Sequence, residues 1–316
     1  MYKGRSVAVV IPAYNEERLI GRVIDTMPTF VDWIVVVDDG SSDRTVDEVR
    51  NRSEALGNRL VLLEHERNQG VGGAISTGYI WARDHEIDAT AVMAGDAQMD
   101  PEELPSLLDP VIEGGGDYTK GNRLLSGEAW RLMPKRRYLG NAGASFLTKV
   151  ASGYWHIADS QCGYTVISKR ALELIPIGAI YKRYGMPNHL LVMLNIYDLR
   201  VRDVVVRPIY KIGEKSGFEP LVMIPKLGWL LFKWFHWRIF QKYVIRDFHP
   251  LVLFYSLAGL LGWTTLGLAG RLFYLWFATG RIHPVNALAM MFAAIAGMQS
   301  AFFAMWFDMD RNKHLR

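Results

Sequence analysis

The C-terminal part of the chain is almost free of charge, and no other feature limits the possible fold as strongly. Between Phe248 and Phe307 the only charged residues are Arg271 and Arg281, although 22% of the whole sequence is charged. Two runs, 248–270 and 284–307, each exceed the roughly 20 apolar residues that cross a bilayer. A pair of buried core helices is the alternative, but such helices rarely run this long without a charge. The sequence therefore predicts a hairpin of two transmembrane helices.

The residues around this hairpin indicate which side of the membrane the rest of the chain occupies. The segment 226–246 has five basic residues, seven aromatic residues and no acidic residue, which is typical of an amphipathic helix at an anionic, cytoplasmic lipid surface. The last residues, 310–316, are also basic, although the expected connecting loop carries Arg271, Arg281 and His283 as well. The N-terminus does not have the pattern of a signal peptide. We expect an integral membrane protein whose front domain stays in the cytoplasm.

Net charge and cysteine content indicate which partners and which cellular compartment to expect. The sequence pI is about 9.0, but the basic excess lies beside the predicted membrane segments, so lipid headgroups are the expected anionic partner and nucleic acid is not. Cys162 is the only cysteine, which excludes an intrachain disulfide and fits a reducing compartment. Self-association through paired hairpins is left open.

The first 160 residues alternate short β-branched runs with helical patterns. This order predicts a mostly parallel sheet with helices on its faces, a Rossmann-like α/β domain. In such sheets ligands bind at the carboxyl ends of the strands. We divide the chain into a catalytic domain (1–220), juxtamembrane amphipathic helices (221–247) and a hairpin with a short cytoplasmic tail (248–316). The expected strands are 6–12, 32–39, 59–66, 89–96 and 201–210, and the expected helices are 17–27, 43–56 and 73–84.

Three polar runs stand at or after the ends of the expected strands. Taken alone, each is a routine turn into a helix, with Asn15 as one helix cap and Ser42 or Asp43 as another. Together they favour a ligand site over three unrelated turns. The runs are IPAYNEE (11–17), DDGSSD (38–43) and RNQGVGGA (67–74).

A fourth run, AVMAGDAQMDPEEL (91–104), contains more polar residues than a helix start needs. Asp100 occupies an N-cap position, Pro101 suits the first helical position, and Glu103 falls at the capping-box position. These roles leave Asp96 and Gln98 unexplained.

The chemistry of a nucleotide-sugar diphosphate suggests a role for Asp96 and Gln98. When the bond between the sugar and the phosphate of a nucleotide sugar breaks, negative charge develops on the departing diphosphate. A divalent cation held by oxygen ligands can neutralise this charge. Such a cation takes one or two protein groups and completes its shell with phosphate and water. Residues spaced two apart point to the same side if the chain is extended. We therefore expect Asp96 and Gln98 to hold Mg²⁺ or Mn²⁺.

The ordered set of motifs resembles the family 2 glycosyltransferases with the GT-A fold, and among them the dolichyl-phosphate or polyprenyl-phosphate sugar synthases. The resemblance covers about residues 6–220. It implies transfer of a sugar, with inversion, from a nucleotide-diphosphate sugar to a polyprenyl phosphate at a membrane. The motifs that carry it are IPAYNEE, DDGSSD, RNQGVGGA, GDAQMDP, KGNR and DSQCGYTVISKRAL.

The resemblance assigns roles on the donor side. The family usually places an aspartate where this chain has Ala94, which leaves Asp96 and Gln98 as the expected metal ligands. How strongly the site binds a metal ion, and which ion it prefers, is left open by this difference. Asp96 is also expected at the nucleotide. The residues expected to hold the nucleobase and ribose are Pro12, Tyr14, Glu16 and Asp39.

It also assigns roles on the acceptor side. Arg123 and Arg137 are expected to bind the acceptor phosphate, with Arg136 as a substitute for Arg137, because forked donors match a phosphate. Asp159 is expected to face the reacting centre; it would be the general base for a hydroxyl acceptor, whereas a lipid phosphate needs none. No role is assigned to His189. Further expected phosphate contacts are Lys211, Lys215 and Ser216.

Three other functions compete with this interpretation. A transferase to the hydroxyl of another lipid or glycan has the same fold, although the Gln-x-x-Arg-Trp motif of processive synthases does not occur here. A sugar nucleotidyltransferase would need a Gly-rich nucleotide loop near the N-terminus, and IPAYNEE is not one. A catalytically silent membrane scaffold is suggested by Ala94.

Overall fold

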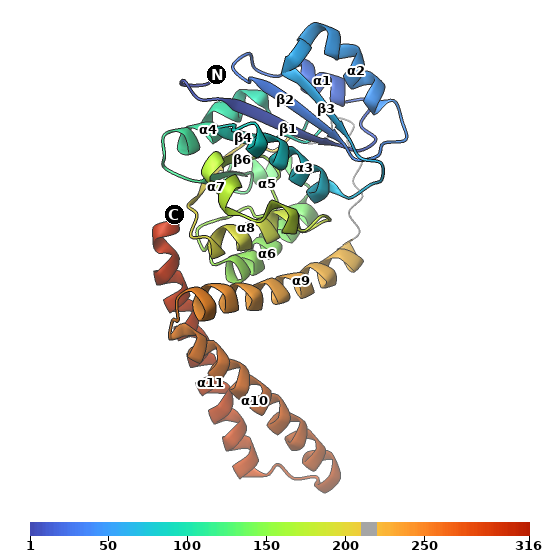
Figure 1. Ribbon diagram of the computed structural model, residues 1–316. Coiled ribbons are helices and arrows are strands. Elements are labelled where there is room, and N and C mark those ends of the chain that lie inside the picture. The colour runs from blue at the N-terminus through green and yellow to red at the C-terminus, as the bar shows by residue number, and fades with distance from the viewer. Residues whose placement is uncertain (210–219) are drawn as a thin grey trace. The chain divides into compact units, whose positions relative to one another are not determined.

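The computed structural model describes residues 1–209 and 220–316, without the side chains of 220–224 (Figure 1). It contains two compact units, Met1–His236 with Leu315–Arg316, and Trp237–His314. The strands are β1 (Val7–Ala13), β2 (Trp33–Asp38), β3 (Leu60–Glu64), β4 (Ala89–Val92), β5 (Tyr118–Asn122), β6 (Thr165–Ser168) and β7 (Val201–Val205). The helices are α1 (Ile20–Asp25), α2 (Thr45–Leu56), α3 (Val71–Asp84), α4 (Leu104–Ile112), α5 (Ala129–Leu132), α6 (Lys135–Ser152), α7 (Lys169–Leu174), α8 (Met186–Ile196), α9 (Pro220–Phe240), α10 (Leu251–Thr279) and α11 (Pro284–Asn312).

The first unit is built on one seven-stranded sheet with the order β3-β2-β1-β4-β6-β5-β7. All pairings are parallel except those of β6, which runs antiparallel to both β4 and β5. The expected mostly parallel sheet is confirmed. The strand order changes direction between β1 and β4, and in open α/β sheets ligands bind at the carboxyl ends of the strands beside such a point.

The two faces of β1 explain why this strand is buried along its whole length. Its residues alternate between the faces, as in any strand. Val9 and its neighbours two residues apart pack with α1, α2 and α4, whereas Val10 packs with β2 and with Ala74 of α3. A Cβ on Gly78 of α3 would lie 2.3 Å from Val10 Cγ1, so only glycine lets α3 approach the sheet this closely.

Two elements are shorter than the sequence predicts. α1 covers six residues of the expected 17–27, because the amide groups of Glu16 and Glu17 donate to side chains of the next loop, Thr45 Oγ1 (2.8 Å) and Asp43 Oδ2 (3.2 Å). β4 ends at Val92 instead of residue 96, where the chain turns toward the site.

The second unit consists of the end of α9, a π-helical turn (Gln241–Arg246) and the α10–α11 hairpin. Leu251–Thr279 and Pro284–Leu315 are long and apolar enough to cross a membrane, and only 6% and 22% of their most apolar windows are buried. Gly297 of α11 lies against Leu261 of α10, with 3.1 Å between its ideal Cβ position and Leu261 Cβ. Arg271 lies inside α10, so the expected loop position for it was wrong.

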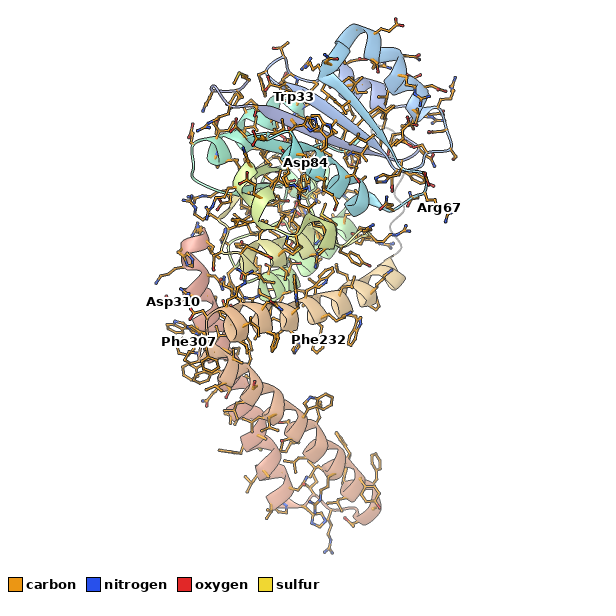
Figure 2. The ribbon with its side chains drawn as sticks, viewed as in Figure 1. Trp33, Arg67, Asp84, Phe232, Phe307 and Asp310 are labelled. Atoms are coloured by element: carbon orange, nitrogen blue, oxygen red, sulfur yellow. The ribbon has the colours of Figure 1, made fainter. Side chains whose placement is uncertain are left out.

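The basic residues of 226–246 divide into two kinds. Arg238 is fully buried and donates to both carboxylate oxygens of Asp308, at 2.8 and 2.9 Å. Lys242 is also buried and donates to Asn312 Oδ1 at 2.9 Å. These two residues are therefore not available to a lipid surface, because a carboxylate and an amide of α11 bind them. Phe307 packs in the same unit, with its ring 5.5 Å from that of Phe254 (Figure 2).

Aromatic residues of α9 divide in the same way. Phe232 and Trp229 are exposed, at 55% and 63%. Figure 2 labels Phe232 on α9. Trp234 is buried instead, with ring centroids 5.4 Å from Tyr181 and 4.8 Å from His189. Part of the aromatic content that indicated a membrane surface therefore serves packing within the first unit.

Candidate active site

The loops after β1 and β2 are joined by hydrogen bonds that involve Asn15. This residue has a left-handed backbone (φ 56°). Its backbone N donates to Ser41 Oγ at 2.9 Å, and its side-chain Oδ1 accepts from the Ser42 backbone N at 2.9 Å. Asn15 therefore connects two loops instead of capping a helix. Asp43 accepts from the backbone N of Thr45 at 3.0 Å, near the start of α2.

Asp39 is buried and bound by the protein itself. Its carboxylate accepts from the backbone N of Gln69 and of Gly70, each at 2.8 Å, and lies 2.8 Å from His65 Nδ1. His65 Nε2 lies 2.8 Å from Thr77 Oγ1 on α3. Asp39 thus fixes the glycine-rich loop before α3. His65 was missed by sequence reasoning, because nothing in its local sequence indicates these partners.

Asp38, unlike Asp39, has a carboxylate oxygen that no described group binds. Its Oδ2 accepts from the Ser41 backbone N at 3.0 Å, while its Oδ1 is buried and has no hydrogen-bond partner within the described residues. A buried acceptor without a partner is rare in native proteins. Asp38 therefore retains an acceptor atom at the end of β2, whereas most of the acceptor capacity of Asp39 is already used.

Pro12, Glu16 and Asp96 come together at the carboxyl ends of β1 and β4. The Gly95 backbone N donates to Pro12 O at 3.3 Å, and a Cβ on Gly95 would lie 3.5 Å from Glu16 Cγ. Burial raises the pKa of Glu16 to about 7, and the negative charges of Asp96 and Asp43 add to the shift. The structure therefore concentrates negative charge where the metal site was predicted.

This arrangement fits a divalent cation. Within the described part of the chain, no three Asp, Glu, His or Cys side chains form a cluster that could hold a metal alone. A magnesium-type site needs only one or two carboxylates, because phosphate and water supply the remaining ligands. A cation at Asp96 would also relieve the repulsion that Glu16 experiences. The donor set and its charge are therefore suitable.

The chain between Asp96 and Gln98 is not extended. Ala97 has a φ of 57°, and Asp96 Oδ1 accepts from the Gln98 backbone N at 3.1 Å. The condition under which both side chains share one side is therefore not met, and a turn brings the two residues together instead. Asp100 caps the following turn as expected, accepting from the Glu102 backbone N at 3.0 Å.

Arg123 and Asp159 form an ion pair on the other side of the site. Asp159 has no exposed surface, and its carboxylate accepts from Arg123 Nε at 2.8 Å and Nη2 at 3.3 Å. Burial favours the neutral acid, but the charge and hydrogen bonds of Arg123 outweigh it and hold the pKa of Asp159 below its usual range. The Gln161 backbone N adds a bond of 3.0 Å. Asp159 is therefore an anion that orients a guanidinium.

A small cavity connects the two sides. Its volume is about 40 Å³, enough for a few atoms or a water molecule. Gln98 and Arg123 both line it, and Gln98 Nε2 is buried without a hydrogen-bond partner in the described part of the structure. The metal side and the cationic side of the predicted site are therefore neighbours. The other lining residues are Met99, Glu103, Cys162, Gly163, Tyr164, Val206, Arg207 and Ile209.

Glu103 has a different role from the expected capping box. Its carboxylate accepts from the backbone N of Arg207, at 2.8 Å, just after β7. Burial raises the pKa of Glu103, and this hydrogen bond opposes the shift. Glu103 therefore ties the chain after β7 to the start of α4 at the wall of the small cavity.

Arg137 of α6 and Arg123 both lie close enough to Tyr184 for their charges to act on its phenol. Burial raises the pKa of the Tyr184 phenol, and the positive charges of Arg123 and Arg137 both oppose the shift. The two arginines therefore act on one side chain. Arg137 is half-buried whereas Arg136 is exposed, which favours Arg137 over its substitute. Tyr184 was missed, because it comes from a loop distant in sequence.

The remaining predicted contacts have different outcomes. Tyr14 is 51% exposed at the tip of the loop after β1. His189, to which no role was assigned, accepts from the Tyr181 backbone N at 3.1 Å and packs on Trp234. Lys211, Lys215 and Ser216 lie outside the described residues.

Comparison with known proteins identifies the class. Residues 8–175 match the model of glycosyl transferase family 2. The UDP-N-acetylglucosamine--dolichyl-phosphate N-acetylglucosaminyltransferase of Methanococcus voltae is 31% identical over 216 residues, which cover 65% of this chain and 86% of that protein. The polyprenol monophosphomannose synthase of Mycolicibacterium smegmatis is 31% identical over 176 residues, 54% of this chain and 65% of that protein. This chain belongs to glycosyl transferase family 2, and it is a glycosyltransferase.

Solved structures support the fold. Glucosyl-3-phosphoglycerate synthase from Mycobacterium tuberculosis, in complex with Mn²⁺, UDP and glucosyl-3-phosphoglycerate, has a TM-score of 0.54 at 21% identity, covering 74% of this chain and 80% of that chain. A structure of glucosyl-3-phosphoglycerate synthase from the same organism with Mg²⁺ and UDP gives a TM-score of 0.54 at 19% identity, covering 74% and 79%. The GT-A fold expected from the sequence is confirmed.

Proposed function

We propose that this protein transfers a sugar from a nucleotide-diphosphate sugar to a polyprenyl phosphate, dolichyl or undecaprenyl, with inversion and at the cytoplasmic face of a membrane. The observation that carries the proposal is the shared cavity. Gln98 of the predicted metal side and Arg123 of the predicted acceptor side line the same small space. The relatives named for dolichyl-phosphate and polyprenol substrates support the choice of acceptor.

On the donor side, the proposal uses the loops at the ends of β1, β2 and β4. Asp96 and Gln98 would hold Mg²⁺ or Mn²⁺, which when bound neutralises the charge that develops on the departing diphosphate. Asp38 would add a hydrogen-bond acceptor for the nucleotide sugar, because its buried Oδ1 has no partner among the described residues. The residues assigned to the nucleobase and ribose remain Pro12, Tyr14, Glu16 and Asp39, with Asp39 acting mainly through the glycine-rich loop that it fixes.

On the acceptor side, Arg123 and Arg137 bind the lipid phosphate, together with Lys211 and Ser216. A phosphate monoester is already an anion near neutral pH, so its oxygen needs no general base to attack the anomeric carbon. The attack opposite to the departing diphosphate inverts the configuration. Asp159 then orients Arg123, because its carboxylate is bound to that guanidinium. Positioning and charge neutralisation supply the rate enhancement.

The membrane segments would hold the catalytic domain at the bilayer surface, where the lipid acceptor lies. The proposal keeps three functional parts, with residues 1–220 as the catalytic domain, 221–247 at the lipid surface and 248–316 as the membrane anchor. A polyprenyl phosphate presents its headgroup at the bilayer surface, where exposed side chains of α9 such as Trp229 and Phe232 would insert. The basic residues of this segment that are exposed, Lys226, Lys233 and Arg246, support a cytoplasmic catalytic domain.

A transfer assay tests the proposed function. Purified full-length protein is incubated in lipid–detergent micelles with polyprenyl phosphate, Mg²⁺ or Mn²⁺ and a panel of labelled nucleotide sugars. We expect label in the organic extract with at least one donor. Asp96→Asn should abolish most of it, whereas Asp100→Asn, which removes the same charge at a nearby helix cap, should retain it. Absence of extractable label across the whole panel would contradict the proposal.

A further inference from the structure

A lysine is completely buried behind the acceptor side of the site. Lys120 lies on β5 and has no exposed surface. Its ammonium group donates to the backbone carbonyl of Cys162. Burying an ammonium group is costly unless hydrogen bonds and opposite charges compensate. The surroundings of Lys120 must therefore supply such groups.

Two carboxylates from different segments supply the negative charge. Asp203 is the register partner of Lys120 in the parallel pairing of β5 with β7, and Asp159 lies in the loop before β6. Burial lowers the pKa of Lys120; the charges of Asp159 and Asp203 oppose this shift, and that of Arg123 adds to it. Lys120, Arg123, Asp159 and Asp203 therefore form one electrostatic cluster.

The loop 158–162 is held by this cluster at both ends. The Ala158 backbone N donates to Asp203 Oδ2 at 2.9 Å, and the Asn122 side chain donates to the same oxygen. At the other end, the Cys162 carbonyl accepts from Lys120. Between these points, Asp159 binds the guanidinium of Arg123. The position of Arg123 thus depends on a loop that Lys120 and Asp203 fix.

We propose that Lys120 is a positioning residue for the acceptor phosphate: it holds the loop 158–162, so that the Arg123 guanidinium bound to that loop stays in one orientation. The inference rests on the proposed function, in which Arg123 binds that phosphate. It adds a residue that acts through Arg123 without touching either substrate. Loss of Lys120 weakens acceptor binding and leaves donor binding unchanged, because its hydrogen bond and its charge act on the loop 158–162 and not on the loops after β1 and β4.

Thr119 offers a matched control for a merely structural role. It precedes Lys120 on β5, points to the opposite face, and is equally buried. Its hydroxyl donates to the Leu107 carbonyl at 2.6 Å. Thr119→Val and Lys120→Met therefore each remove one buried donor to a backbone carbonyl from the same strand. Only the second change removes a charge beside Asp159.

The experiment measures KM for donor and acceptor separately, and the pH profile of acceptor kcat/KM, on full-length protein. For Lys120→Met we expect the acceptor KM to rise about tenfold or more, the effect of losing well-oriented charge-assisted hydrogen bonds, with donor KM nearly unchanged. The acid limb of the profile should move to higher pH: burial already raises the pKa of Asp203, which holds the Ala158 end of the loop, to about 6, and removing the opposing Lys120 charge raises it further. Thr119→Val should change neither KM value nor the profile, and should only lower Tm.

The other possible results separate a failure of this inference from a failure of the proposed function. If the wild type transfers sugar and Lys120→Met retains its acceptor KM and acid limb, or raises both KM values equally, the inference is wrong while the proposed function stands. If the wild type transfers no sugar to polyprenyl phosphate, both fall. If Lys120→Met does not fold, Lys120→Gln, which keeps a donor toward Cys162 without the charge, is measured in the same way and is expected to show the acid-limb shift with a smaller rise in acceptor KM; an unchanged acid limb would overturn the inference.

Discussion

At the scale of single residues, the site depends on how each ionisable group is neutralised. Asp159 is a buried anion because Arg123 binds it with two nitrogens. Asp39 is buried with three partners that hold a loop. Burial raises the pKa of Glu16 to about 7 instead, and the like charges of Asp96 and Asp43 add to this shift. The uncompensated charge therefore lies on the donor side, where a cation and a nucleotide are proposed to bind.

Arg137 provides a residue-level prediction for the acceptor side. Arg137→Ala should raise the acceptor KM about tenfold or more, because a forked donor to the phosphate is lost. Arg136→Ala should change it less than about twofold, since Arg136 is exposed. Steady-state kinetics with polyprenyl phosphate as the varied substrate measures both. A larger effect at Arg136 than at Arg137 would reverse the assignment.

His189 provides a prediction about pH and stability. Burial lowers its pKa from 6.5 to about 4, so the unfolded chain takes up the proton first as the pH falls. The contribution of His189 to stability is therefore complete above about pH 6.5 and decreases toward pH 4, by about 2 kcal/mol at pH 5. Chemical unfolding of the wild type and of His189→Asn at several pH values measures it. An equal pH slope for both proteins would show that His189 is not the source, and exposed His85→Asn serves as the control.

At the scale of elements, hydrophobic periodicity was enough to predict β1, β2, β3 and α2 to within a few residues, because each buries one regular face or lies wholly inside the sheet. The ends were less predictable. β4 stops early because Gly95 and Asp96 turn toward the loop after β1, and α1 starts late because the amides of Glu16 and Glu17 bind side chains of another loop. Such bonds between distant segments leave no periodic signal.

The packing of α3 on β1 gives an element-level prediction. Gly78→Ala places a methyl group 2.3 Å from Val10 Cγ1 and should destabilise the protein by about 1–3 kcal/mol. Gly143→Ala on α6 meets no atom within 4 Å and should stabilise it by about 0.5–1 kcal/mol, because alanine loses less conformational freedom in a helix. Thermal unfolding in detergent measures both. Equal shifts in Tm would show that α3 does not pack as described.

At the scale of the whole molecule, composition separated a charged part from an apolar hairpin, and the motif order predicted the family and the candidate site. What it could not predict were partners distant in sequence. Arg238 lies in the segment expected at the lipid surface, and Asp308 lies 70 residues away in the part expected to form the hairpin and tail. The two nevertheless form a buried pair within the second unit. His65, Tyr184 and Lys120 were missed for the same reason, because their roles follow from tertiary neighbours.

The buried pair gives a prediction for the second unit. Asp308→Asn leaves the buried Arg238 guanidinium without its counter-charge and should destabilise the unit by about 3–5 kcal/mol. Asp310, further along α11, is exposed and binds only Lys313 within the described contacts, at 2.7 Å (Figure 2), so Asp310→Asn should change stability by less than about 1 kcal/mol. Thermal unfolding in detergent compares the two variants. Similar Tm values would contradict a buried, structural ion pair.

The central claim is that the acceptor is a lipid phosphate held by arginines, and not a hydroxyl activated by a base. The most direct measurement compares polyprenyl phosphate with the matching polyprenol, of equal chain length, in the same transfer assay with the same nucleotide sugar. The account predicts a sugar-linked product from the phosphate and none from the alcohol. Equal transfer to the alcohol, or transfer to the alcohol alone, would contradict it.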